Sequence, residues 1–264
     1  MARSPGPLFS LVWLAAFCFF LPAEGEELPS CLPPVAGTAK VVAVRDNGVL
    51  VLDDDRTVKL EGLIWPVGER DGAPDPTPAG PTAALRRLVA GRRLVLRVKE
   101  PRLDRYDRLR VQALLADGDW LQREILRRGL ARVSVAPDRP ECARELYAAE
   151  AEARAAGLGL WASSAYRVRT PESLRWQDLG TFQIVEGKVV NAKVSGGRAY
   201  LNFGRNWRTD FTVTISLEDM KRFKVANIDP YSYAEKTMRV RGWIDRLHGF
   251  EIEAASPTQI EVLK

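Results

Sequence analysis

Residues that could support catalysis are few in this sequence of 264 residues. The only histidine, His248, has no cysteine or carboxylate cluster around it, which argues against a Ser-His-Asp triad and against a zinc centre. The longest acidic run is Asp53 to Asp55, and it falls in a predicted hairpin turn, where adjacent side chains cannot all point at one cation. We therefore expect no metal site in this turn and an exposed position for His248.

The elements predicted for the first half follow the order of a small OB-type barrel with added helices. The Asp46-Asn47-Gly48 turn predicts a hairpin, and a segment rich in proline and glycine predicts a loop at 67–82. Pro at the start and Gly past the end favour a helix at 81–90. The strands are expected at 40–44, 49–52, 57–64, 94–98 and 109–115, with a strand-like segment at 130–135, and the other helices at 120–128, capped by Asp119, and 141–156.

Four short motifs in this order resemble the thermonuclease (staphylococcal nuclease-like) family. They are Asp104-Arg105-Tyr106-Asp107-Arg108, Ala116-Asp117-Gly118, Gly129-Leu130-Ala131 and Gly159-Leu160-Trp161. The first is similar to the family's Asp-Lys-Tyr-Gly-Arg segment and the last to its closing Asn-Ile-Trp. The resemblance covers residues 39–163 and implies calcium-dependent hydrolysis of phosphodiesters.

That chemistry needs two aspartates on the calcium ion, a carboxylate that positions the attacking water, and two arginines that stabilise the charge on phosphate. Gly48 and Ile64 stand where the resemblance places metal-binding aspartates. Trp65 replaces the threonine whose carbonyl binds the metal, and Val67 replaces the glutamate. We therefore expect no metal and no cofactor, and calcium only if nearby Glu61, Glu69 or Asp71 rebuild a site.

The positions that correspond to the family's phosphate-binding residues are still positively charged here, whereas the positions that correspond to its metal ligands have lost their carboxylates. Lys59 and Arg108 correspond to the two stabilising arginines and are the candidate catalytic remnants, although lysine lacks the bidentate fork of arginine. Arg105 and Tyr106 are candidate ligand-binding residues by the same resemblance. The alternative for Lys59 and Arg108 is pairing with local acids such as Asp104 or Glu61.

The second half predicts another OB order, and it resembles the OB-like module of some exported bacterial thermonuclease-family proteins through segments 200–204 and 240–244. Such folds bind oligonucleotides or oligosaccharides with aromatic and basic groups near strands 2 and 3. Phe203 is expected in the core, which leaves Arg205, Trp207 and Arg208 as exposed candidate ligand contacts. The expected elements are strands at 182–194, 199–203 and 211–216, a helix at 217–223, and a final hairpin of 237–244 with 250–254.

Arg3 followed by the apolar segment 8–21 predicts an export signal, because the segment is shorter than the ~20 residues of a membrane-spanning helix. We expect a periplasmic or secreted protein that is not an integral membrane protein. Loss of the signal removes Cys18 and leaves Cys31 and Cys142, for which we predict a disulfide. The expected organisation is a signal peptide at 1–25, a leader at 26–35, a thermonuclease-like domain at 36–166, a linker at 167–180 and an OB-like domain at 181–264.

The fold class is thus mainly β with helices, as tandem OB-type barrels of which the first carries three helices. The net charge of +5 permits contact with nucleic acid without requiring it. The leading hypothesis is a non-catalytic protein of the bacterial envelope that binds nucleic acid or another extended anionic ligand. Two alternatives stay open, namely an active metal-dependent phosphodiester hydrolase and an envelope module that binds a protein or a glycan.

Overall fold

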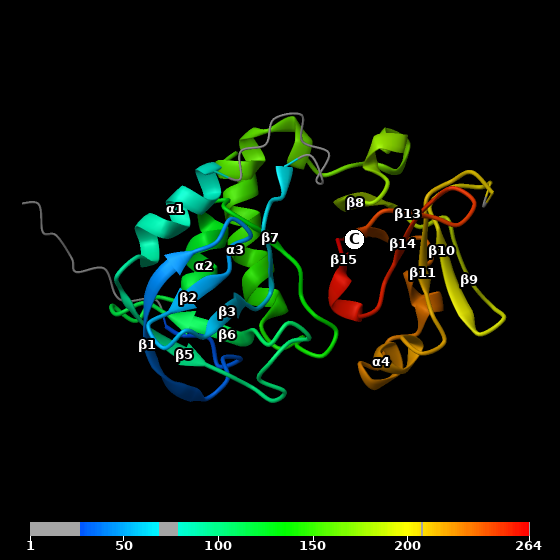
Figure 1. Cartoon of the computed structure of the whole chain (residues 1–264). Helices are drawn as coiled ribbons and strands as arrows, with labels where there is room; N and C mark the ends of the chain where they lie inside the picture. Colours follow the sequence, from blue (N-terminus) through cyan, green and yellow to red (C-terminus); the bar gives the residue numbers. More distant parts are fainter. Residues whose placement is uncertain (1–26, 69–78, 207, 264) are drawn as a thin grey trace, which may run out of the picture.

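The computed structural model describes residues 27–68, 79–206 and 208–263, and it shows two β-rich domains side by side (Figure 1). The expected signal peptide lies outside the described residues, as do Glu69, Asp71 and Trp207. Within the described part of the chain, no helix is long and apolar enough to cross a membrane.

The first domain is built on a closed five-stranded barrel, as the strand order predicted. Its strands follow one another around the barrel as β1 (Val35–Val44), β2 (Leu50–Leu52), β3 (Thr57–Leu60), β6 (Leu109–Leu114) and β5 (Arg93–Arg97), which returns to β1. The pairs are antiparallel except for β3 with β6, which is parallel. Leucine and valine side chains from alternate strand positions fill the barrel, since neighbouring residues of a strand point to opposite faces.

Three helices cover the barrel (Figure 1): α1 (Ala79–Val89), α2 (Leu121–Arg127) and α3 (Ala143–Ala155). The prediction of Asp119 as the α2 cap was wrong, because Trp120 holds that position. Trp120 is fully buried, and Asp119 instead accepts the amide of Leu115 in the preceding turn. The expected strand at 57–64 is interrupted at Gly62, which has a φ of 81°. Its last part is β4 (Leu63–Ile64), which pairs with β7 (Arg132–Val133), the only described strand within 130–135.

The second domain keeps the OB pairing order, but its sheet is not closed. One sheet runs β13 (Asp245–Arg246), β14 (Phe250–Glu253), β11 (Thr212–Ile215), β10 (Arg198–Asn202) and β9 (Asn191–Ser195). The other runs β15 (Ile260–Val262), β12 (Thr237–Trp243) and β8 (Phe182–Lys188), with helix α4 (Met220–Val225) after β11. The third and fifth strands of an OB fold pair in parallel. In the first domain these strands are β3 and β6, and in the second they are β11 and β14.

Two strand predictions for this domain were wrong. The expected strand at 182–194 is two strands, because the amide of Val189 turns to the carbonyl of Lys236 and that of Val190 to Asn202. The expected hairpin of 237–244 with 250–254 does not form: β12 pairs with β8 and β15, while β14 takes β13 as its antiparallel partner. This exchange leaves the barrel open between β12 and β14.

The segment between the domains consists of short 3₁₀ turns that pack on the second domain. Leu174 is buried in that domain's core, and the amide of Arg169 donates to the carbonyl of Ile184. Arg169 also lies 3.3 Å from buried Asp178. The linker is therefore anchored to the second domain.

Buried arginines join the two domains. Arg241 on β12 is 1% exposed and donates to Glu150 of α3 at 2.9 Å and to the carbonyl of Val133 at 3.2 Å. From the other side, Arg132 on β7 donates to the carbonyl of Phe182 at 2.6 Å. These contacts hold β7 and α3 of the first domain against β8 and β12 of the second.

Candidate functional site

Trp65 fills the place where the thermonuclease resemblance would put a metal ion. Its side chain is 7% exposed and packs on Gly48, where an added Cβ would lie 2.6 Å from the indole ring. The indole Nε1 donates to Thr82 Oγ1 at 3.2 Å, and that hydroxyl donates to the carbonyl of Asp46. An aspartate at position 48 would therefore collide with the indole ring, so these two replacements fit each other.

Among the described residues, carboxylates do not replace the lost ligands. Glu61 is 4% exposed and is paired with two cations, since Arg110 Nη2 lies 2.9 Å from its Oε2 and Lys59 Nζ lies 3.8 Å from its Oε1, although Oε1 accepts no hydrogen bond from a described residue. Among the described residues, no group of three or more His, Cys, Asp or Glu side chains could hold a metal ion. Ile64 and Val67 supply no side-chain oxygen in any case.

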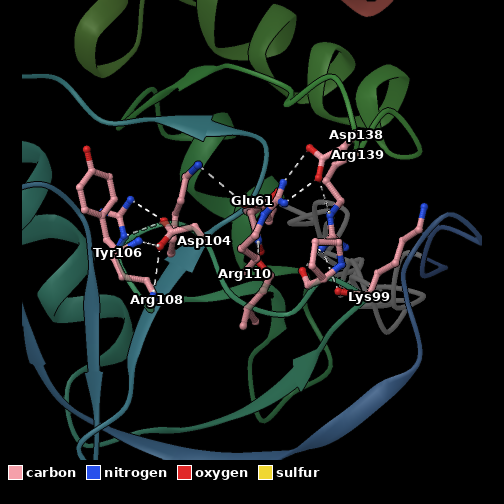
Figure 2. Close-up of polar contacts among 12 residues, drawn as sticks. Glu61, Lys99, Asp104, Tyr106, Arg108, Arg110, Asp138 and Arg139 are labelled. Carbon is pink, nitrogen blue, oxygen red and sulfur yellow. Dashed lines mark hydrogen bonds and ion pairs between the residues drawn. The ribbon is translucent and has the colours of Figure 1, made fainter. Parts of the chain in front are cut away.

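Arg108 is held by Asp104, as the sequence alternative proposed (Figure 2). Its Nε and Nη2 donate to Asp104 Oδ2 at 2.8 and 2.6 Å, and the backbone amide of Arg108 donates to Oδ1. Partial burial by itself would raise the pKa of Asp104, but these hydrogen bonds and that from the amide of Tyr106 lower it. The charge of Arg108 is thus engaged within the turn that carries it.

Tyr106 projects from the same turn and is 61% exposed. The guanidinium carbons of Arg105 and Arg108 lie 4.9 and 5.0 Å from the centre of its ring, which orients the ring by cation–π attraction. Arg105 is exposed and forms no ion pair with a described residue. Arg105 and Tyr106 therefore remain available to a ligand.

Arg110 is the site residue that the sequence analysis missed (Figure 2). It binds Asp138 through Nη1 at 2.6 Å and Glu61 through Nη2 at 2.9 Å. The hydrogen bond between Arg110 and Asp138 lowers the pKa of Asp138. Arg110 lies on β6 directly opposite Lys59 on β3, so pairing of these two predicted strands was a signal for it. Lys59, Arg108 and Arg110 are therefore all ion-paired with nearby acidic residues.

A cavity of about 640 Å³ opens between this site and the second domain. The first domain contributes Lys59, Arg108 and the Trp65 ring to its walls. The second domain contributes two aromatic residues and three carboxylates: Phe182, Trp243, Asp245, Glu251 and Glu253. Carboxylates repel phosphate, so the cavity is a poor channel for a polyanion.

The second-domain candidates are only partly brought together. Phe203 is 7% exposed and packs on Phe211 with ring centres 5.0 Å apart, so its expected core position is confirmed. Arg205 and Arg208 are exposed on the 204–210 loop and do not line the interdomain cavity, while Trp207 lies outside the described residues. His248 is exposed in its turn as expected, but it lines a second cavity of this domain.

Residues 80–163 match the family model described as Staphylococcal nuclease homologue. The match begins at α1 and ends just after the Gly159–Ala162 turn, so it covers the Asp104 to Arg108 segment and not Gly48 or Trp65. No match was found among curated proteins. Residues 80–163 are therefore similar to staphylococcal nuclease homologues, and the closed five-stranded barrel fits that similarity.

Calcium is expected to leave the melting temperature unchanged at millimolar concentration. A ligand stabilises a fold only when it binds the native state, and Gly48, Ile64 and Val67 offer calcium no side-chain oxygen. Thermal unfolding with and without calcium tests this, with magnesium at equal ionic strength as the control. An upward shift with calcium alone would show that Glu61, Glu69 or Asp71 has rebuilt a metal site.

Proposed function

We propose that the protein is a non-catalytic nucleic-acid-binding protein of the bacterial envelope. The observation that carries the proposal is the contrast between two cationic regions of the nuclease-like domain. At the former catalytic positions, Trp65 fills the metal pocket and the cations are paired with acids. On another face, a group of exposed cations forms no ion pair with any described acidic residue.

This second region, which we call the arginine face, combines the end of α1, the start of β5 and the facing part of β1. Its members are Lys40, Arg86, Arg87, Arg92 and Arg93, all of them exposed. Strand register places Lys40 directly opposite Arg93, and the carbonyl of Arg92 accepts the amide of Val41. None of the five forms an ion pair with a described residue. These elements lie on the side of the first domain that faces away from the second (Figure 1).

Arginine is suited to phosphate because its planar fork can donate two parallel hydrogen bonds. Cations that have no acidic partner can bind a polyanion directly, whereas cations in ion pairs must first break a favourable contact. The exposed Tyr106 between Arg105 and Arg108 adds a ring on which a base can stack. The proposal therefore assigns affinity to the arginine face and a secondary contact to the 104–108 turn.

Binding to single-stranded DNA and RNA is expected to weaken steeply with salt. Each phosphate contact to a single strand contributes about −0.7 to the slope of log affinity against log salt. Arg92→Glu/Arg93→Glu is expected to reduce that slope by about 1.4 and to lower affinity at least about tenfold. Fluorescence anisotropy with a labelled oligonucleotide at several salt concentrations measures both quantities.

The matched control is Lys221→Glu/Lys224→Glu, which changes net charge equally at exposed positions of the second domain. It should leave both slope and affinity close to those of the unaltered protein. Absence of binding at low salt, or an equal loss in the control, refutes the proposal. Binding to heparin but to neither nucleic acid would assign the arginine face to another extended anion.

Cleavage assays on the same protein distinguish the non-catalytic proposal from the hydrolase alternative. The proposal expects no calcium-dependent cleavage of DNA or RNA above that of a buffer blank. Cleavage that requires calcium and disappears in Arg108→Ala would establish the enzyme instead.

A further inference from the structure

A second cavity, of about 400 Å³, lies on the outer face of the larger sheet of the second domain. It is separate from the arginine face, and what it could bind goes beyond nucleic-acid recognition. Strands β9, β10, β11 and β14 form its floor, and the β13–β14 turn with Leu247 and His248 forms one wall. Its volume falls within the range of ~300–1,000 Å³ typical of small-molecule sites.

Strand alternation explains which side chains reach this cavity. On β10, Ala199 and Leu201 are fully buried in the domain core, so Tyr200 and Asn202 point to the opposite face. The register then places Lys193 of β9 directly opposite Tyr200.

The remaining floor is polar and held in a fixed arrangement. Thr212 of β11 pairs with Asn202 on one side and with Glu251 of β14 on the other, and its hydroxyl donates to Asn202 Oδ1 at 3.2 Å. Glu251 Oε1 accepts the Thr214 hydroxyl at 3.3 Å. The strands of the floor thus present aromatic rings, amides, hydroxyls, a lysine and a carboxylate.

Glu251 has spare hydrogen-bonding capacity at this floor. Its Oε2 is buried and accepts no hydrogen bond from any described residue. Desolvation raises the pKa of Glu251, although the bond from Thr214 and the charge of Arg198 act in the opposite direction. A buried polar atom without a partner is uncommon in native proteins, and a ligand that donates a hydrogen bond would satisfy it.

The charges of the cavity select the class of ligand. Lys193 and His248 are the basic lining residues, and the carboxylate of Glu251 opposes them. A phosphate or sulfate would meet the carboxylate, whereas a neutral ligand with several hydroxyl groups would both donate to it and accept from Asn191, Asn202 and Lys193. The half-buried ring of Tyr200 offers a flat apolar surface for the C–H face of a sugar ring.

We infer that this cavity is a binding site for a neutral saccharide, with a pyranose ring on Tyr200 and its hydroxyl groups hydrogen-bonded to Asn191, Asn202 and Glu251. The nuclease-like domain takes no part in this site. The protein would then carry two independent binding surfaces, one for a polyanion and one for a glycan.

Calorimetric titration of the full protein with chitotetraose, cellotetraose and maltotetraose tests the inference. At least one of these neutral sugars is expected to bind, and Tyr200→Ala should weaken that sugar about tenfold or more, which equals ~1.4 kcal/mol. Glu251→Gln, which keeps the shape of the side chain, should also weaken binding. Tyr231→Ala is the matched control, because Tyr231 is an exposed tyrosine of the same domain outside this cavity.

Nucleic-acid binding measured on the same variants keeps this inference separate from the proposed function. Tyr200→Ala and Glu251→Gln should leave oligonucleotide affinity unchanged, which also shows that the variants are folded. The inference is overturned if none of the three sugars shows binding at sugar concentrations up to about 10 mM. A dissociation constant of 1 mM corresponds to a binding free energy of about −4.1 kcal/mol, so this range includes weak binding. The inference is equally overturned if a sugar binds but is indifferent to Tyr200, or if Tyr200→Ala abolishes oligonucleotide binding instead.

Discussion

Replacement of Arg241 by alanine is expected to lower the free energy of unfolding by about 3–5 kcal/mol, because it removes one partner of a fully buried ion pair. Arg241 and Glu150 are 1% and 0% exposed in their side chains and lie 2.9 Å apart. Without the guanidinium, Glu150 would keep a negative charge in the interior, with Arg154 at 3.3 Å as its remaining cationic partner among the described residues. Urea denaturation followed by circular dichroism measures the loss.

Further contacts of Arg241 make this effect larger than that of an ordinary ion pair. Its Nη2 donates to Glu261 Oε1 at 2.5 Å, and its guanidinium carbon lies 4.1 Å from the centre of the Tyr147 ring. Burial by itself would lower the pKa of Arg241, but Glu150, Tyr147 and Glu261 raise it, so the residue stays charged. Because Glu150 and Tyr147 belong to the first domain, the alanine variant should also loosen the domain interface.

Arg239→Ala is the matched control, since Arg239 lies two residues earlier on β12 and pairs with Glu186 at 2.6 Å. That pair is partly exposed, so its loss should cost about 1 kcal/mol or less. Arg241→Met/Glu150→Gln should recover part of the stability lost in Arg241→Ala, because no uncompensated charge stays buried. Equal losses for Arg239→Ala and Arg241→Ala would show that the buried pair has no special role in stability.

Removal of the disulfide is the second change with a large expected effect. The predicted pairing of Cys31 with Cys142 is confirmed, with their Cα atoms 5.3 Å apart across a sequence separation of 111 residues. The bond ties the segment before β1 to the residue that caps α3. Closing a loop of this length restricts the unfolded chain, and Cys31→Ser/Cys142→Ser should lose up to ~4–5 kcal/mol.

The same urea experiment, run with and without dithiothreitol, measures this loss. The reductant should destabilise the unaltered protein and leave the double serine variant unchanged, which controls for effects of the reductant elsewhere. A chain beginning at Glu26 contains no other cysteine, so unfolding it without reductant should release no titratable thiol. Two reactive thiols under these conditions would contradict the prediction.

The barrel order was accessible from sequence because short-range signals determine it. The Asp46-Asn47-Gly48 turn predicted the first hairpin, and Pro81 with Gly91 marked the helix that is α1. The predictions failed where long-range pairing competes with local propensity. The 182–194 segment has strand residues throughout, yet it divides because the amide of Val189 donates to the carbonyl of Lys236, a residue distant along the chain.

For the candidate site too, some features could be predicted from residue identity and others depended on the tertiary structure. Residue identity alone established the loss of oxygen ligands at Gly48, Ile64 and Val67, since no fold can supply a carboxylate from these side chains. Identity could not show whether Lys59 and Arg108 were free for a ligand, because pairing with acids depends on geometry. The structure decided that question by placing Asp104 and Glu61 within reach of them.

The sequence by itself thus determined the barrel class of the first domain and the lack of side-chain oxygens at Gly48, Ile64 and Val67, and it predicted the pairing of Cys31 with Cys142. Tertiary structure alone decided that Trp65 packs on Gly48, that Arg110 joins Glu61 across 49 residues, and that second-domain carboxylates face the old catalytic positions. The physical reason is that local propensities and side-chain chemistry are properties of short segments. Burial and charge pairing arise only when segments far apart in the chain exclude water together.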